Sequence, residues 1–253
     1  MKELIEPNNI YKGDCLELMK SIPDRSVDMI LADLPYGTVS CEWDNIIPFD
    51  KLWEQYNRII KDSGPIVLTA SQPFTSLLIS SNPKMFKYAW VWKKNKATGF
   101  VNAKYKPLSI YEDILIFGKG KTTYNPQGLQ PYNKIIKPSI KESQTTDRIY
   151  KQKNTKPYLR EFTNYPKNII EFSCEQGLHP TQKPVPLFEY LIKTYTNEGE
   201  LVLDNTAGSM TTAIAAINTH RNYICMEQDE EYFKKGLERI RQHQELLKPE
   251  PQI

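Results

Sequence analysis

Short apolar runs alternate along the chain with segments whose apolar residues recur at helical spacing. Each run is four to six residues long and bounded by turn residues, which predicts buried strands at 27–32, 66–70, 201–204 and 223–227. Helical spacing appears in the segments 49–60, 187–195, 210–217 and 231–247. Strands that alternate with helices predict an α/β protein with a doubly wound, mostly parallel sheet.

The middle of the chain departs from this alternation. Aromatic and β-branched residues predict two further strands at 88–92 and 112–117. A loop is expected between them, and it carries Lys93, Lys94, Lys96 and Lys104. Residues 119–172 show no sustained period, which predicts an irregular insert with short strands at most. We therefore expect one domain made of residues 1–118 and 173–253, interrupted by the insert.

Charge is distributed unevenly between the insert and the rest of the chain. The net charge of the 253 residues is +3. Residues 119–170 contain 11 Lys and Arg against 3 Asp and Glu, so they carry +8 and leave −5 on the remainder. A basic insert in an acidic body predicts that the insert contacts a polyanion such as nucleic acid.

Several classes of protein are disfavoured by the composition. No stretch approaches 18 consecutive apolar residues, which argues against a membrane span. The first ten residues lack the pattern of a signal peptide, so we expect a cytoplasmic protein. None of the four cysteines lies in a CxxC pair and the histidines are scattered, so no metal site is expected.

Two acidic residues end predicted strands in the last third of the chain. Asp204 and Glu227 are 23 residues apart, close to the spacing at which an acid binds ribose hydroxyls in nucleotide-binding folds. The loop after Asp204 has the single glycine Gly208, whereas a pyrophosphate site usually has more. The loop therefore suits a phosphate-free adenosine ligand, and the alternative is a plain strand-turn-helix in which Gly208 only makes the turn.

A third acid ends the predicted strand at 27–32, in the segment Asp33-Leu34-Pro35-Tyr36. Pro35 restricts the backbone, so the Asp33 carboxylate and the Leu34 carbonyl become neighbouring acceptors. Two acceptors match the two N–H donors of an exocyclic amino group, and the ring of Tyr36 offers a face for stacking a base. A simple surface turn is the alternative for this segment taken alone.

Four segments together resemble the DNA amino-methyltransferases. Asp-Leu-Pro-Tyr at 33–36 is similar to their (Asp/Asn/Ser)-Pro-Pro-(Tyr/Phe) motif, and His-Pro-Thr-Gln-Lys-Pro at 179–184 is similar to a second signature. The segment 204–212 resembles their cofactor loop, and Gly-Asp-Cys at 13–15 resembles the start of these enzymes. The chemical motif precedes the cofactor motif, with the insert between them, which is the order of the β group.

The resemblance implies an activity, a cofactor and a partner. Asp33 and the Leu34 carbonyl would hold the target amine, Pro35 would shape the turn, and Tyr36 would stack on the base. The methyl donor would be S-adenosylmethionine, and the partner would be double-stranded DNA with the target base flipped out. The insert would be the target-recognition region, and homodimerisation is a further expectation from the family.

The resemblance also implies residues around the cofactor. Asp14 and Cys15 would lie near its adenine, Glu227 would hold its ribose, and Thr181 and Lys183 would lie close to its carboxylate. The loop residues expected along its methionine part are Asp204, Thr206, Gly208 and Ser209. Asp33 is expected to belong to both the catalytic and the cofactor-binding set.

Alternatives remain at the level of the substrate. Asp rather than Ser at position 33 favours N6 of adenine, and N4 of cytosine is the alternative. RNA or a protein glutamine would be a further substrate of related sites. Leu34 replaces the first proline of the motif and Met210 replaces the second glycine of the cofactor loop, which leaves a catalytically silent cofactor- or DNA-binding homologue as another alternative.

Overall fold

The computed structural model describes residues 5–37, 45–137, 156–175 and 182–248. The chain divides into two compact units, one formed by residues 1–125 and 168–253 and the other by residues 126–167. Within the described ranges, no helix combines the length and hydrophobicity of a membrane span. Nor do the described residues group three or more His, Cys, Asp or Glu side chains as metal ligands.

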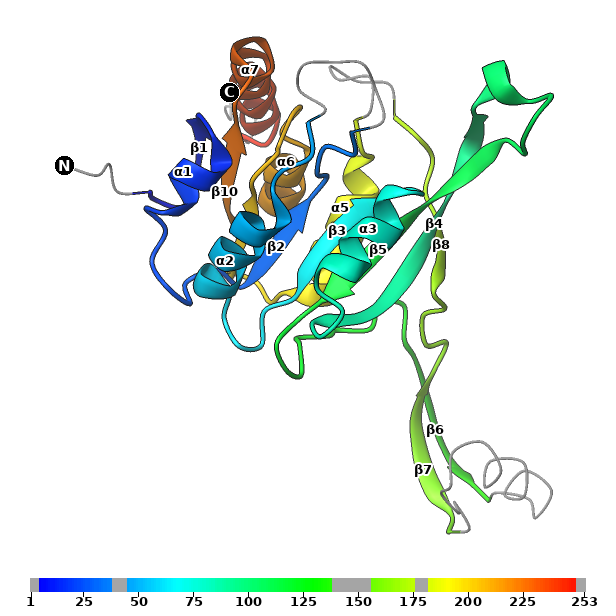
Figure 1. Ribbon diagram of the computed structural model, residues 1–253. Helices are drawn as coiled ribbons and strands as arrows, with labels where there is room; N and C mark the ends of the chain where they lie inside the picture. Colours follow the sequence, from blue (N-terminus) through cyan, green and yellow to red (C-terminus); the bar gives the residue numbers. More distant parts are fainter. Residues whose placement is uncertain (1–4, 38–44, 138–155, 176–181, 249–253) are drawn as a thin grey trace, which may run out of the picture. The chain divides into compact units, whose positions relative to one another are not determined.

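An eight-stranded sheet forms the centre of the larger unit (Figure 1). In spatial order its strands are β1 (Asn9–Lys12), β10 (Asn222–Glu227), β9 (Leu201–Asp204), β2 (Met29–Ala32), β3 (Ile66–Ala70), β5 (Ser109–Phe117), β4 (Phe86–Thr98) and β8 (Ile169–Glu171). Only β5 runs antiparallel to its neighbours among these described strands. The predicted mostly parallel α/β sheet is therefore confirmed.

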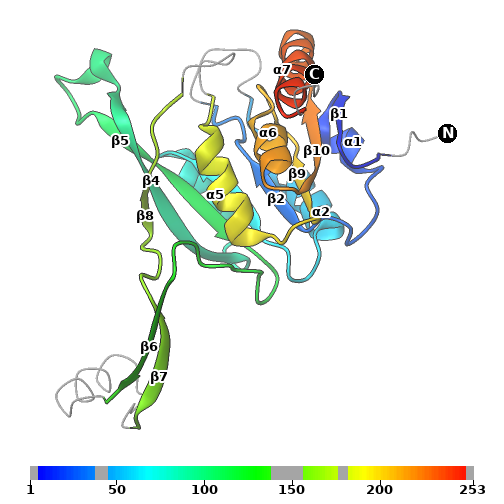
Figure 2. The ribbon, with the colours of Figure 1, turned by 180° about the vertical axis from the view of Figure 1, so that it is seen from behind.

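Helices cover both faces of this sheet (Figures 1 and 2). One core cluster joins the sheet to α1 (Cys15–Met19), α2 (Phe49–Ile59) and α3 (Phe74–Ser81). The other joins it to α5 (Val185–Tyr195), α6 (Thr211–Asn218) and α7 (Glu230–Leu246). Successive residues of β2 alternate between the two clusters, because neighbouring side chains of a strand point to opposite faces. This explains why β2 is apolar at every position.

The structure corrects the sequence-based prediction in three places. The edge strand β1 was not predicted at all. Strand β4 continues to Thr98, so Lys93, Lys94 and Lys96 lie in a strand rather than in the expected loop. β4 and β5 form a long antiparallel hairpin, so the sheet is mixed on this side.

The smaller unit is described by itself. Its described part is an antiparallel ribbon of β6 (Gln130–Ile136) and β7 (Tyr158–Thr163). Lys134 and Arg160 each place a cation over the ring of Tyr132. The unit is narrower than the expected insert 119–172, because residues 119–125 and 168–172 group with the larger unit.

Candidate active site

A cleft of about 510 Å³ opens at the carboxyl ends of the parallel strands. Ligands bind at this edge in open α/β sheets, because the loops that follow the strands gather there. All the site residues predicted from the sequence that lie in the described ranges line this one cleft: Asp14, Cys15, Asp33, Leu34, Pro35, Tyr36, Lys183, Asp204, Thr206, Gly208, Ser209 and Glu227. Thr181 lies outside the described residues.

Asp204 is a buried carboxylate at the end of β9, only 3% exposed. Its Oδ1 accepts the backbone N–H of Thr206 at 3.1 Å, and its Oδ2 accepts the hydroxyl of Thr212 at 2.5 Å. Burial disfavours the charged form and raises the pKa of Asp204 to about 7, although these two hydrogen bonds act in the opposite direction. Asp204 can therefore change its charge near neutral pH.

Glu227 ends β10 and connects the cofactor loop to the neighbouring strand. Its Oε2 accepts the backbone N–H of Gly208 at 2.7 Å, and its Oε1 accepts that of Asp229 at 2.8 Å. Gly208 adopts a left-handed conformation with φ of 49°, which glycine reaches without a steric penalty. Burial raises the pKa of Glu227, against the lowering effect of the backbone donors.

Met210 follows this loop and points away from the cleft. Its backbone is left-handed, with φ of 62°, and its side chain is fully buried in the core that carries α6 and α7. The side chain lies against Gly236 of α7, where no Cβ competes for the space. The methionine that stands in place of the family's glycine therefore packs its side chain in the core, and this side chain does not line the cleft.

The first turn of α1 forms another wall of the cleft. Asp14 is the N-cap of this helix, and its Oδ1 accepts the N–H of Leu16 at 2.7 Å. The Cys15 sulfur accepts the side-chain amide of Asn205 at 3.5 Å, and the oxygen of that amide accepts the hydroxyl of Tyr56 at 2.5 Å. Burial raises the pKa of Cys15, so its thiol is a neutral, apolar wall rather than a nucleophile.

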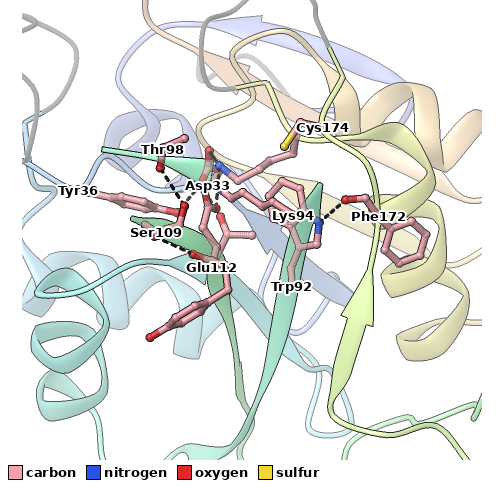
Figure 3. Close-up of polar contacts among 12 residues, drawn as sticks. Asp33, Tyr36, Trp92, Lys94, Thr98, Ser109, Glu112, Phe172 and Cys174 are labelled. Carbon is pink, nitrogen blue, oxygen red and sulfur yellow. Dashed lines mark hydrogen bonds and ion pairs between the residues drawn. The ribbon is translucent and has the colours of Figure 1, made fainter. Parts of the chain in front are cut away.

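Asp33 is fixed in the cleft by donors from four different segments, of which Tyr36 is labelled in Figure 3. Its Oδ1 accepts the hydroxyl of Tyr36 at 2.9 Å and that of Thr69 at the end of β3. Its backbone carbonyl accepts the hydroxyl of Thr206 at 3.0 Å, and its Oδ2 accepts the ammonium of Lys183 at 2.5 Å. The motif that bears Asp33 and the loop that bears Thr206 are thus directly joined.

Lys183 is the centre of a partly buried group of charges. Its side chain is 6% exposed and lies between the carboxylates of Asp33 and Glu112, with 3.4 Å to Glu112 Oε2. Burial lowers the pKa of Lys183, but the attraction of the two carboxylates outweighs burial and the net shift is upward. The other oxygen of Glu112 pairs with Lys94 of β4. A series of ion pairs therefore runs from Lys94 and Glu112 of the β4–β5 hairpin through Lys183 to Asp33.

Leu34 and Tyr36 support the turn from the core side. Leu34 is 3% exposed and belongs to the core cluster that contains residues of α2, so its side chain is packed in the core. Tyr36 stacks on Phe74 of α3 with ring centroids 5.0 Å apart and an interplanar angle of 22°. One face of the Tyr36 ring is thus held by the protein.

Sequence analysis missed several residues of this cleft. Thr69 and Glu112 were treated only as parts of predicted strands and Lys94 as part of a predicted loop, although Thr69 directly contacts Asp33 and Glu112 lines the cleft. The strand end at Thr69 carried a usable signal, because polar residues at carboxyl ends of parallel strands tend to reach a site. No local signal marked Glu112, whose partner Lys183 is 71 positions away in the chain.

Comparisons with known proteins agree on one family. The sequence model of the DNA methylase family matches residues 27–238. The DNA adenine methyltransferase YhdJ of Escherichia coli K12 is 32% identical over 93% of this chain and 83% of its own length. The type II methyltransferase M2.MboI of Moraxella bovis is 28% identical over 96% and 90% respectively.

Solved structures give the same result. The M1.HpyAVI complex with S-adenosylmethionine has a TM-score of 0.61 and 27% identity, and covers 91% of this chain and 98% of its own. The cytosine-N4-specific PvuII DNA methyltransferase has a TM-score of 0.64 at 18% identity over 95% and 92%, which shows the shared fold. The chain therefore belongs to the family of DNA amino-methyltransferases, and its cofactor is S-adenosylmethionine.

Proposed function

We propose that this protein transfers a methyl group from S-adenosylmethionine to N6 of adenine in DNA. The observation that carries the proposal is that Asp33 faces the same cleft as Asp204 and Glu227. Asp at the first position of the motif favours adenine within the family. YhdJ, at 32% identity, is itself named as a DNA adenine methyltransferase.

The charges of the cleft suit this cofactor. Five carboxylate residues and one lysine are found among the described residues that line it: Asp14, Asp33, Glu112, Asp204, Glu227 and Lys183. A cleft with this balance attracts a cationic ligand and disfavours a phosphate group. S-adenosylmethionine supplies a cationic sulfonium centre with a transferable methyl group and carries no phosphate, so the residues present fit it.

Individual residues then have proposed binding roles. Glu227 would accept hydrogen bonds from the ribose hydroxyls, since a carboxylate can accept two at once. Asp14 and Cys15 would border the adenine, and the methionine part would lie along Asp204, Thr206, Gly208 and Ser209. Thr181 and Lys183 would bind its carboxylate. Because Lys183 Nζ is 2.5 Å from Asp33 Oδ2, this ammonium would link the cofactor site to the catalytic carboxylate.

The hydrogen bonds of the described residues leave Asp33 one acceptor position for the target amine. A carboxylate offers about four lone-pair sites, and three are already used by Tyr36, Thr69 and Lys183. The remaining site on Oδ2 would accept one N–H of the amine, and the Leu34 carbonyl would accept the other. These two acceptors would orient the amine and favour a pyramidal nitrogen, whose lone pair is otherwise delocalised into the ring.

The target base must leave the duplex to reach this cleft. Tyr36 would stack on the extruded base, because Phe74 holds the ring of Tyr36 from behind. The unit 126–167 would be the target-recognition region, since its sequence carries 9 Lys and Arg against 3 Asp and Glu. Its exposed Tyr158 and Phe162 are available for contacts with bases.

Substitution of Asp33 tests the catalytic role. We expect Asp33→Ala to reduce methyl transfer by at least about a thousandfold, because it removes an acceptor that acts in the transition state. Isothermal titration should still detect cofactor binding. Asp62→Ala is the matched control, because the Asp62 side chain is 69% exposed and pairs only with the surface residues Arg25 and Lys119 among the described ones. Turnover retained by Asp33→Ala would contradict the role given to Asp33.

The product identifies the base. DNA methylated with tritiated cofactor would be digested to nucleosides and separated, and N6-methyldeoxyadenosine is the expected product. N4-methyldeoxycytidine would contradict the adenine assignment while leaving the family intact. Cofactor binding without transfer to any DNA or RNA would identify a silent homologue. Long-read sequencing of DNA from expressing cells would then locate the recognition site.

A further inference from the structure

The β4–β5 hairpin ends in a tip whose apolar side chains face solvent. Phe100 is 69% exposed, Val101 94% and Tyr105 87%. The tip turns through Gly99, with φ of 91°, and is held by its own backbone bonds, such as Tyr105 N–H to Asn102 O at 2.9 Å. These three side chains are absent from both core clusters, so they do not contribute to the described core.

The hairpin is also strongly basic. Residues 93–111 contain five lysines and no acidic residue. Lys93 and Lys94 pair with carboxylates near the base of the hairpin. The other three are exposed and form no ion pair with any described residue: Lys96, Lys104 and Lys106. Exposed apolar residues beside unpaired lysines complement a polyanion with flat apolar groups, which is the chemistry of nucleic acid.

The direction of the strands places the tip at the carboxyl-end edge of the sheet, where the cleft opens. β5 is antiparallel to both β3 and β4, so β4 runs in the direction of β3 and ends at the cleft edge. Both ribbon views show the far part of this hairpin extending beyond the neighbouring strands (Figures 1 and 2). Glu112 in β5 lines the cleft, so the hairpin rises directly from its wall.

We propose that the β4–β5 hairpin is a DNA-contacting arm in addition to the unit 126–167. Its three unpaired lysines bind phosphates, and Phe100, Val101 and Tyr105 contact bases or sugars in the adjoining groove. β4 continues for four residues beyond Lys94 to Thr98, which corresponds to a reach of about 13 Å before the tip turns. That length spans about four base pairs, so the arm contacts the duplex close to the flipped base.

This proposal rests on DNA methylation as the function, and the test separates the two. The tip variant is Lys96→Ala combined with Lys104→Ala and Lys106→Ala. Its matched control removes three exposed lysines that lack ion pairs among the described residues and lie towards the end of the strands remote from the cleft: Lys84 before β4, Lys87 near the start of β4 and Lys193 in α5. Both variants would be compared with wild type for thermal unfolding, cofactor binding and DNA methylation at several salt concentrations.

We expect the tip variant to raise KM for DNA roughly tenfold or more at 0.15 M salt. The slope of log affinity against log salt should become shallower by about 2.7, because three phosphate contacts are lost. The control variant should match wild type, and cofactor affinity should be unchanged in both. Equal KM and salt slope in tip and control variants would overturn the arm, whereas absence of DNA methylation in wild type would overturn the proposed function.

The apolar part of the tip has its own test. We expect Phe100→Ala with Tyr105→Ala to raise KM for DNA at least about fivefold without changing the salt slope. DNA bearing 5-iododeoxyuridine near the target base should photo-cross-link to the tryptic peptide 97–104. Cross-links found only in residues 126–167 would overturn the arm. Conversion of a wild-type dimer to a monomer by the tip variants would also overturn it, since the tip would then be a subunit contact.

Discussion

At the scale of single residues, the raised pKa of Asp204 is expected to make cofactor affinity depend on pH. Burial raises its pKa from 3.8 to about 7. It is therefore about one tenth ionised at pH 6 and about nine tenths ionised at pH 8. Its proposed place beside the cationic methionine part requires the ionised form. We expect the Kd for S-adenosylmethionine to fall about tenfold between these pH values, as measured by isothermal titration.

Asp204→Asn provides the control, because an amide does not titrate. The variant should bind cofactor weakly at pH 8 and lose the part of the pH dependence that Asp204 contributes. An identical pH profile in both proteins would contradict the proposed role. Without cofactor, the folded state holds the Asp204 proton more tightly than the unfolded state does. The contribution of Asp204 to the free energy of unfolding should therefore decrease as pH rises from about 4 to about 7, and stay level above.

At the scale of elements, the contact between α6 and α7 depends on a methionine and a glycine. Replacing a mid-helix glycine by alanine ordinarily stabilises a helix by about 1 kcal/mol. At Gly236 the added Cβ would collide with Met210 Cγ and lie 3.0 Å from its Cε. We therefore expect Gly236→Ala to lower the free energy of unfolding by about 1–3 kcal/mol, as measured by urea denaturation.

A double-mutant cycle isolates this contact. Met210→Ala alone should destabilise by about 2–5 kcal/mol, because it opens a cavity in the core. In that background the Gly236→Ala change should become neutral or stabilising, since nothing remains to collide with the new methyl group. Cofactor affinity should be unchanged throughout, because Met210 does not line the cleft. Additive effects of the two changes would show that the residues do not interact.

Periodicity predicted the elements that are buried on both sides and failed where strands are half exposed. The strand ending at Asp204 was predicted with its observed bounds, because its position between two helical layers makes it apolar throughout. β1 was missed because it is a four-residue edge strand with polar ends. The lysines of β4 were assigned to a loop because the outer half of the hairpin lacks a buried face.

The cleft was predictable only to the extent that its residues lie at strand ends or in motifs. Asp33 and Asp204 met both conditions, Glu227 met the first, and the structure brings the three together. The contact of Glu112 with Lys183 depends on how an antiparallel hairpin lies beside the parallel strands. Local sequence contains no information about that pairing, so this contact could be found only in the folded molecule.

At the scale of the whole molecule, the residues of the cleft all belong to the larger of the two units. Both core clusters, the eight-stranded sheet and the cleft residues belong to residues 1–125 and 168–253, and no described residue of 126–167 belongs to either core cluster. The described core of the larger unit is therefore formed by that unit's own residues. Recognition of a DNA sequence would depend on the smaller unit, if the basic unit 126–167 is the target-recognition region.

Replacement of residues 126–167 by a flexible Gly-Ser linker tests this division of labour. The variant should unfold at nearly the wild-type temperature and bind S-adenosylmethionine within about threefold of wild type, because no core residue is removed. Site-specific methylation should fall at least about a hundredfold, since several phosphate contacts and all base contacts of the unit would be lost. Sequence-specific methylation retained by the variant would instead assign recognition to the larger unit, with the β4–β5 hairpin as its remaining DNA contact.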